Sequence, residues 1–490
     1  MIINVKIGLR LFCKPLVFQV PRFPAFLPTG VRTFSETRFN MAAAKDLLSF
    51  VDASPTPFHV VAKAESVLET AGFKQLNERD VWKGQVQVGG KYFYHRNRST
   101  LVAFAVGDKY VPGNEFKVIG AHTDSPVLKV KPVSNRTSNG YLQVGVECYG
   151  GGLWHTWFDR DLTLAGCVII EKEGAFTREL VNLKRPLLRV PNLCIHLQSS
   201  EERSSFTVNK ENHLQPILAM VESTLNQKDE GQHSSVLLEL LAGELGVQVD
   251  QIKDMELTLT DTQPGATWGP KNEFLSSPRL DNQVHCFTGL SALLEHSKDL
   301  SNDTGVSMLA CFDHEEIGSD SAQGAGSPVM SDGLSRVLGC FDSSDETLKI
   351  TIRNSFMISA DVAHAIHPNY SEKHEKKHQP KLNQGTVIKT NSNQRYATNS
   401  ETGFLLRELA RRAVVPVQEF VVRNDCPCGS TIGPIVSAKT GIRTVDLGIA
   451  SLSMHSIRET IGCDDIETNI RLFSTFYSGF GELDKSCSFN

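Results

Sequence analysis

Phe116-Lys-Val-Ile-Gly-Ala-His122 is an apolar run that ends directly in a histidine, and the class of fold follows from this pattern. Two other apolar runs end in a similar way. Val306–Phe312 is followed by Asp313-His-Glu-Glu316, and Phe356–Ala360 is followed by Asp361. Short apolar runs of this kind are typical of buried strands. The predicted strands therefore carry ligand-type side chains at their carboxyl ends.

Stretches with the apolar spacing of helices alternate with such strands. They include residues 60–71, 282–294, 404–413 and 467–480, and Ser400 is a candidate cap for the third of them. This alternation predicts an α/β fold with an open, mostly parallel sheet covered by helices. In such sheets ligands bind beyond the carboxyl ends of the strands, so the polar residues there are the first candidates for a functional site.

The middle of the chain has a different character. Residues 128–200 have the pattern of strands and turns, and two stretches with helical spacing follow at 217–225 and 236–245. We therefore expect a β-rich domain inserted into the α/β domain. The expected boundaries are an N-terminal extension at 1–40, two parts of a catalytic domain at 41–127 and 259–490, and the inserted domain at 128–258.

The overall composition argues against several classes of function. The 490 residues carry a formal net charge of −5, so the basic surplus of a nucleic-acid binder is missing. No apolar run reaches the roughly 20 residues that span a bilayer, so we expect no membrane partner. The 11 cysteines are scattered without a Cys-x-x-Cys pair, which argues against a structural zinc site and favours reduced thiols inside a cell.

Residues 1–40 have an unusual balance of charge, with six basic residues and a single acid, Glu36. An import peptide has this balance. The alternative is an upstream start codon, because Met41-Ala-Ala-Ala44 would begin an ordinary protein. We expect a cytoplasmic protein, with a plastid or a mitochondrion as the alternative if the segment is an import peptide.

Five ligand-type residues fall on the predicted carboxyl edge of the sheet, namely His122, Asp281, Glu316, Asp361 and His455. Zinc takes imidazole nitrogen and carboxylate oxygen, and a pair of zinc ions needs a bridging carboxylate with two further ligands for each ion. The five residues satisfy that count. Glu315 is then left over as the natural general base for a bridging water. Each residue alone has an ordinary structural explanation, such as a helix cap for Asp281, so the argument depends on their recurrence at one edge.

The motifs that contain these residues resemble, in their order, the M18 family of metallopeptidases. The motifs are His122-Thr-Asp-Ser-Pro, Pro278-Arg-Leu-Asp-Asn, Asp313-His-Glu-Glu-Ile-Gly-Ser, Ser359-Ala-Asp-Val-Ala-His-Ala-Ile-His-Pro-Asn-Tyr and Met454-His-Ser-Ile-Arg-Glu. Within the family the likeness is greatest to the eukaryotic aspartyl aminopeptidases. The resemblance implies a zinc-exopeptidase type of fold and a hydrolase that releases N-terminal Asp and Glu from peptides.

The resemblance also implies a role for each residue at the sheet edge. One zinc would be held by His122 and Asp361 and the other by Glu316 and His455, so the implied cofactors are two Zn²⁺ per subunit. Asp281 would bridge the two ions. Two residues would complete the catalytic set, with Glu315 as the base and Asp124 as a support for His122.

Substrate contacts and assembly follow from the same resemblance. His196 would reach the active site of a neighbouring subunit, and residues 128–258 would be a dimerisation domain in a tetrahedral dodecamer built from dimers. Lys389 would face the acidic side chain of the substrate, with Tyr396 beside it. The strand-like Thr386-Val-Ile388 independently favours a place for Lys389 near the ligand edge, although an exposed lysine on the surface is the ordinary interpretation.

Two competing interpretations remain to be weighed. His374-Glu-Lys-Lys-His378 matches the His-Glu-x-x-His zinc signature. We reject it, because its neighbours are polar and Pro380 follows, whereas a buried zinc-protease helix needs apolar neighbours and no early break. A different class of function is a catalytically inactive oligomeric shell that binds cargo or peptides. Such a protein would lose the base or the bridging carboxylate, and here Glu315 and Asp281 are both present.

Overall fold

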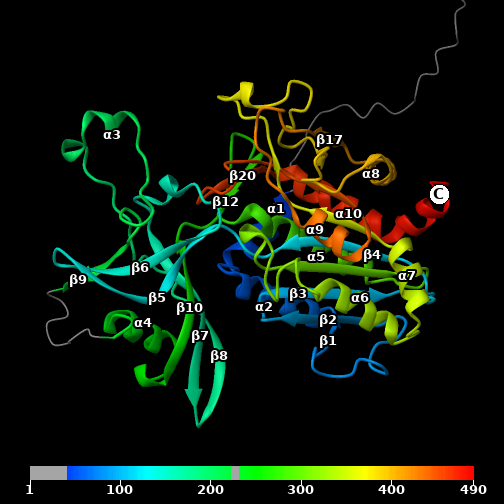
Figure 1. The fold of residues 1–490 in the computed structure, drawn as a ribbon, viewed down its shortest axis with the longest axis horizontal. Coiled ribbons are helices and arrows are strands. Elements are labelled where there is room, and N and C mark those ends of the chain that lie inside the picture. Colours follow the sequence, from blue (N-terminus) through cyan, green and yellow to red (C-terminus); the bar gives the residue numbers. More distant parts are fainter. Residues whose placement is uncertain (1–40, 222–230, 490) are drawn as a thin grey trace, which may run out of the picture. The chain divides into compact units, whose positions relative to one another are not determined.

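A nine-stranded sheet forms the centre of the α/β part of the protein (Figure 1). The computed structural model describes residues 41–221 and 231–489, which belong to one compact unit. The strand order in the sheet is β1-β2-β3-β13-β4-β14-β18-β16-β17. The bounds, in that order, are Lys74–Gln75, Lys91–Arg96, Thr100–Val106, Val306–Phe312, Phe116–His122, Phe356–Ala360, Arg443–Gly448, Thr386–Lys389 and Val417–Phe420.

The middle of this sheet is parallel. Strand β4 pairs in parallel with both β13 and β14, and β14 pairs in parallel with β18. Every residue of β4 and β13 is buried, which is why both strands are continuous apolar runs in the sequence. Antiparallel strands flank this block, with β3 beside β13 and β16 beside β18. The prediction of an open, mostly parallel sheet is confirmed.

Helices cover both faces of the nine-stranded sheet, and each face has its own hydrophobic core. One core contains residues of α1 (Met41–Asp52), α2 (Pro57–Thr70), α5 (Leu280–His296), α8 (Ser400–Ala413) and α10 (Cys463–Lys485). The other core lies against α6 (Val329–Gly339), α7 (Asp345–Asn354) and α9 (Ile432–Thr440). The predicted helices at 60–71, 282–294, 404–413 and 467–480 are confirmed within one or two turns. The predicted cap is wrong, because Asn399 rather than Ser400 accepts the first backbone N–H groups of α8.

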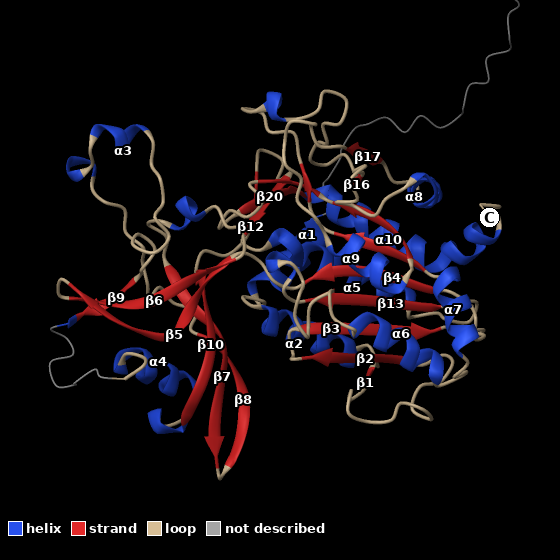
Figure 2. Cartoon of the chain, viewed as in Figure 1, coloured by secondary structure: helices blue, strands red, loops and turns tan. Residues whose placement is uncertain are grey.

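A second, antiparallel sheet has the order β8-β7-β10-β5-β6-β9, and Figure 2 shows it beside the α/β part. Its strands are Ala175–Asn182, Leu162–Lys172, Ile252–Asp261, Val127–Ser138, Tyr141–Tyr149 and Ile217–Met220. The helix predicted at 236–245 is confirmed as α4 (Ser235–Leu245), which packs on this sheet through Leu237 and Leu241.

The helix predicted at residues 217–225 is wrong in its first part. Residues 217–220 form the edge strand β9, which pairs with β6, and 222–230 lie outside the described residues. A short apolar run has no clear period of its own, so pairing with a neighbouring strand decides its structure. The predicted boundaries at 128 and 258 stay a prediction.

A third sheet has the order β11-β12-β20-β19-β15, and the loop between its strands β19 and β20 carries His455. Its strands are Ala266–Trp268, Phe274–Ser277, Glu459–Gly462, Ala450–Leu452 and Ala363–His364. Short helices include η1 (Trp154–Trp157), η2 (Ile195–Leu197), α3 (Ser200–Ser204), η4 (Val249–Gln251), η5 (Glu315–Ile317) and η6 (Ser371–Lys373). Among the described residues, no helix is both long and apolar enough to cross a membrane. The predicted extension at 1–40 lies outside the described residues.

Candidate metal centre

The register of the parallel strands brings the predicted ligands to one place. His122 is the last residue of β4 and pairs with Phe312, the last residue of β13. On the other side of β4, Gly120 pairs with Ser359, so β14 ends at the same edge. The residues that follow β13 and β14 therefore turn over the end of β4. Because the strands are parallel, three separate parts of the sequence deliver polar side chains to one edge.

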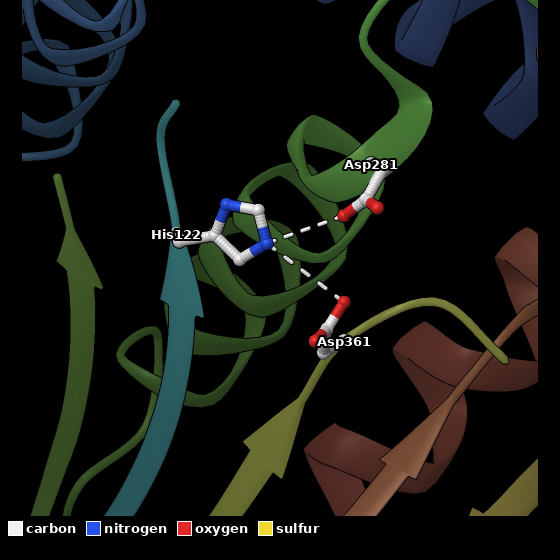
Figure 3. A group of neighbouring side chains, drawn as sticks. All are labelled: His122, Asp281 and Asp361. Atoms are coloured by element: carbon white, nitrogen blue, oxygen red, sulfur yellow. Dashed lines mark ion pairs between the residues drawn. The ribbon is translucent and has the colours of Figure 1, made fainter. Parts of the chain in front are cut away.

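Asp281 lies at the middle of the cluster, with its two carboxylate oxygens facing two different histidines. Its Oδ1 is 3.2 Å from Nε2 of His122, and its Oδ2 is 3.2 Å from Nε2 of His455. Figure 3 shows the first of these contacts together with Asp361, whose Oδ1 is 3.8 Å from Nε2 of His122. Oε2 of Glu316 is 3.3 Å from Nε2 of His455.

These contacts define two groups of three donors that share one aspartate. One group is His122, Asp281 and Asp361, and the other is Asp281, Glu316 and His455, with all donor atoms in each group within 4.8 Å of one another. Glu315 joins a third such group with His122 and Glu316. The sequence-predicted ligands and the predicted base are therefore all brought together.

The electrostatics of the cluster favour a cation. Four carboxylates, those of Asp281, Glu315, Glu316 and Asp361, share the site with two imidazoles. Burial, and then the negative charge of neighbouring carboxylates such as Asp361, raises the pKa of Glu315 to about 8, although His122 opposes the shift. Burial would lower the pKa of His455, but contacts with Asp281 and Glu316 raise it to about 10.

Two buried oxygens of the cluster, Oδ1 of Asp281 and Oε1 of Glu316, have no hydrogen-bond partner among the described residues. An unpartnered buried oxygen is costly, so it marks a place where another group is expected. Carboxylate oxygens and imidazole nitrogens are the donors that zinc prefers, and a divalent cation would neutralise the excess negative charge. The residues present therefore fit a zinc site.

The backbone around the ligands is unusual. Arg279, His314 and His455 have left-handed backbone conformations, with φ of 58°, 65° and 63°. Each lies at a ligand or within two residues of one. The peptide bond between Asp281 and Asn282 is cis. The three left-handed turns direct Asp281, Glu316 and His455 toward one another.

Two buried carboxylates support the ligands from outside the cluster. Asp124, predicted as a support for His122, accepts hydrogen bonds from the backbone N–H groups of Glu315 (3.1 Å) and Glu316 (3.0 Å). Sequence reasoning assigned no role to Glu459, which accepts hydrogen bonds from the backbone N–H groups of Asp281 and His455, both at 2.7 Å. Its position four residues after His455, at the start of β20, was the available signal.

A cavity of about 800 Å³ opens from the cluster. Lys389 and Tyr396 line it, as do Arg395 and His364, and Asp361 and Glu315 line its metal end. Lys389 is only 2% exposed, so the ordinary interpretation of it as a surface lysine is wrong. Its Nζ donates to the carbonyl of Val362 at 3.0 Å and lies 3.7 Å from Oδ2 of Asp361.

His196 is not brought into this cluster within one chain. It lies in η2 on an exposed loop, between Ile195 and Leu197, which are 59% and 71% exposed. The rejected motif at residues 374–378 does not form a helix, and His378 pairs with Glu375 instead of facing His374.

Comparison with known proteins gives one consistent answer. Residues 50–477 match the family described as aminopeptidase I zinc metalloprotease (M18). A probable aspartyl aminopeptidase of Ricinus communis is 50% identical over 471 residues, which cover 90% of this chain and 96% of the relative. Aspartyl aminopeptidase 4 of Saccharomyces cerevisiae is 46% identical, over 93% of this chain and 98% of the relative.

Solved structures agree with the sequence comparisons. A chain of the Ape4 and Nbr1 complex, solved by cryo-EM, superposes with a TM-score of 0.90 at 45% identity, covering 92% of this chain and 88% of that one. The crystal structure of prApe1 gives 0.86 at 33% identity, over 90% and 96% of the two chains. The fold and the family match are thus those of a metalloaminopeptidase, a hydrolase of peptide bonds. More narrowly, the chain belongs to the M18 family of zinc metallopeptidases.

Proposed function

We propose that this chain is a di-zinc aminopeptidase that releases N-terminal Asp and Glu from peptides. The observation that carries the proposal is the position of Asp281, whose two oxygens face two different histidines at 3.2 Å each. A carboxylate in this position is suited to bridge two ions. Names of the relatives, several of which are aspartyl aminopeptidases, support the choice of acidic residues.

The proposed ligand set divides between the two ions. His122 and Asp361 would hold one zinc, Glu316 and His455 would hold the other, and Asp281 would bridge them. This division follows the two groups of donor atoms that share Asp281. Two zinc ions held there would supply Lewis-acid polarisation of the scissile carbonyl and would acidify the attacking water.

Glu315 would act as the general base. Its Oε2 lies 3.9 Å from Nε2 of His122, so it borders the donor groups without being needed as a ligand in either. The carboxylate would take a proton from the attacking water and return it to the leaving amine, as general acid–base catalysis requires. The hydrogen bonds from its own N–H and that of Glu316 to Asp124 hold this turn in place.

Lys389 would select the acidic side chain of the substrate. One of the three donors of its ammonium group binds the carbonyl of Val362, and the group lies 5.2 Å from the ring centre of Tyr396. The remaining donors can face a carboxylate in the cavity. Burial makes such a charged hydrogen bond stronger than it would be at the surface.

We further propose that the active particle is a tetrahedral dodecamer built from dimers, with residues 128–258 as the dimerisation domain. A solved relative, the S. cerevisiae mApe1 dodecamer, superposes with a TM-score of 0.80 at 32% identity. In this assembly His196 would reach the site of a neighbouring subunit. Leu193, Ile195 and Leu197 beside it are more than half exposed, which favours burial against another copy.

The alternative function is a catalytically inactive oligomeric shell. Such a protein would lose the base or the bridging carboxylate, and this chain retains both Glu315 and Asp281. The discriminating experiment measures the metal content and the hydrolysis of peptides with N-terminal Asp, Glu, Leu or Lys, with and without a chelator. We expect two zinc ions per chain and chelator-sensitive release of Asp and Glu. In an Asp281→Asn variant, we expect loss of at least one ion together with activity. Two ions retained in that variant would refute the bridging role of Asp281.

A further inference from the structure

The segment between β6 and η1 connects the six-stranded sheet to the metal centre at two points. It begins with Tyr149, the last residue of β6, and runs through three glycines to Leu153. One contact reaches Asp124, and the other reaches His455. His455 belongs to one of the two donor groups that share Asp281, and Asp124 lies beside His122 of the other.

The first contact is a hydrogen bond from Oη of Tyr149 to Oδ2 of Asp124, at 2.7 Å. Asp124 is 1% exposed, and its Oδ1 lies 3.4 Å from Nδ1 of His122. The same carboxylate receives the N–H groups of Glu315 and Glu316. Nδ1 of His122 also faces the backbone carbonyl of Asp124 at 3.0 Å. Tyr149 therefore supplies a side-chain donor to the residue that contacts both His122 and the Glu315–Glu316 turn. Burial, and the charge of Asp124, raise the pKa of the Tyr149 hydroxyl, so it remains a donor.

The second contact is made by the backbone of the same segment. The carbonyl of Gly151 accepts a hydrogen bond from Nδ1 of His455 at 3.0 Å, and the N–H of Leu153 donates to the carbonyl of His455 at 2.8 Å. A histidine that donates from Nδ1 keeps Nε2 free for a metal. Gly150 has φ of 75°, and a Cβ there would lie 3.2 Å from Cβ of Glu316, so glycine suits this close approach.

The six-stranded sheet holds Tyr149 in a fixed position. Its side chain is buried, and Nζ of Lys129 lies 4.5 Å from the centre of its ring. Lys129 is itself paired with Glu256 of β10 at 2.7 Å. Tyr149 also pairs with Val127 across β5 and β6. The hydroxyl is thus aimed from a paired strand whose neighbouring side chains contact the ring.

We propose that Tyr149 is a positioning residue, through which the six-stranded sheet orients the supports of the metal centre. It acts through Asp124, while the Gly151 carbonyl acts on His455. The metal affinity of the site therefore depends on a contact between two sheets. This inference rests on the proposed ligand set, because it assumes that His122, Glu316 and His455 bind metal.

The test is a Tyr149→Phe variant, which removes one hydroxyl and leaves the packing of the ring. We expect zinc affinity, measured by competition with a chromogenic chelator, to fall about 10- to 100-fold. The turnover number should fall while KM stays unchanged, and the melting temperature of the metal-free protein should fall no more than in the control variant described next. A matched control is Tyr92→Phe, which removes another buried hydroxyl, one that donates to the carbonyl of Gln85. It should leave zinc affinity unchanged.

A double-mutant cycle adds a second criterion. If Tyr149 acts through Asp124, the effects of Tyr149→Phe and Asp124→Asn on zinc affinity must be less than additive. Fully additive effects, or wild-type affinity and turnover in Tyr149→Phe, would overturn the inference alone. A wild-type protein that binds no zinc would overturn the proposed function, and this inference with it.

Discussion

Strands β4 and β13 have charged residues near both of their ends, and the two clusters differ in how their charges are matched. At the end opposite the metal centre, Asp303 accepts hydrogen bonds from Nζ of Lys117 at 2.6 Å and from Nε2 of His296 at 2.7 Å. The N–H of Gly305 and the hydroxyl of Ser307 also donate to it. Each oxygen of this buried carboxylate has partners.

The cluster at the carboxyl end also combines carboxylates with imidazoles, but the protein alone does not supply all of its hydrogen-bond partners or balance its negative charge. Carboxylates outnumber imidazoles there, and one oxygen each of Asp281 and Glu316 has no hydrogen-bond partner among the described residues. A buried network with all partners present stabilises a fold, whereas one with missing partners indicates a ligand. The difference between the two ends therefore separates a structural role from a functional one.

The largest expected effect at the metal end is on catalysis. Replacing Glu315 with Gln removes the proposed base and should lower turnover about 100- to 10,000-fold. Zinc content should stay intact, because neither donor group centred on Asp281 needs Glu315. The measurement pairs steady-state kinetics with metal analysis of the purified variant. Near-normal turnover would remove Glu315 from the mechanism.

At the opposite end the largest expected effect is on stability. Asp303→Asn leaves Lys117 buried without a counter-charge, and breaking a buried pair in this way costs about 3–5 kcal/mol. Zinc content per folded chain should be unchanged. Denaturant unfolding of the metal-free proteins measures the loss. If the variant instead lost zinc and kept its stability, the assignment of a structural role to this end would be wrong.

A substitution at Lys389 tests whether its buried ammonium group binds the acidic side chain of the substrate. A charged hydrogen bond of about 1.5–3 kcal/mol to the substrate carboxylate corresponds to a preference of roughly 10- to 150-fold. Lys389→Met should lower the ratio of kcat/KM for Asp and Asn peptides by that factor. Arg395, which lines the same cavity, offers the control in Arg395→Met. An unchanged ratio in the Lys389 variant, together with a lower ratio in the Arg395 variant, would assign recognition of the acidic side chain to Arg395 instead.

The smallest expected effect concerns acid stability. Burial alone would raise the pKa of Asp303, but His296 and Lys117 hold it well below its usual range. A depressed folded-state pKa gives stability that is present above the unfolded pKa of about 3.9 and is lost as the pH falls below it. The stability difference between wild type and Asp303→Asn should therefore shrink between pH 6 and pH 3. A difference that grows toward acid pH would contradict this sign.

The clustering of the candidate ligands could be predicted from the sequence because their positions are local. His122 and Asp361 directly end or follow buried strands, and parallel pairing then brings the strand ends together. The contacts of Tyr149 and Asp303 could not be predicted in the same way. Tyr149 meets Asp124 from a different sheet, and Lys117 lies 186 positions from Asp303 in sequence. Nothing in the spacing of these residues specifies such pairs.

The wrong prediction of a helix at residues 217–220, which form strand β9, has the same origin. Residues 217–220 are too short for a period to show, and their structure comes from pairing with β6. His196 adds a further limit, because its predicted partner would be another copy of the chain. Local pattern was therefore sufficient for the buried strands and their ends, and insufficient wherever a residue acts through a distant neighbour.

The left-handed backbone at Arg279, His314 and His455 has a consequence for protein engineering. A non-glycine residue in this conformation costs of order 1–3 kcal/mol, so the three turns together lower the stability of the fold. In return these turns direct the side chains of the candidate metal site toward one another. Substitutions that relieve the strain at these turns would raise thermostability. They would also displace the side chains of the candidate site and so lower activity.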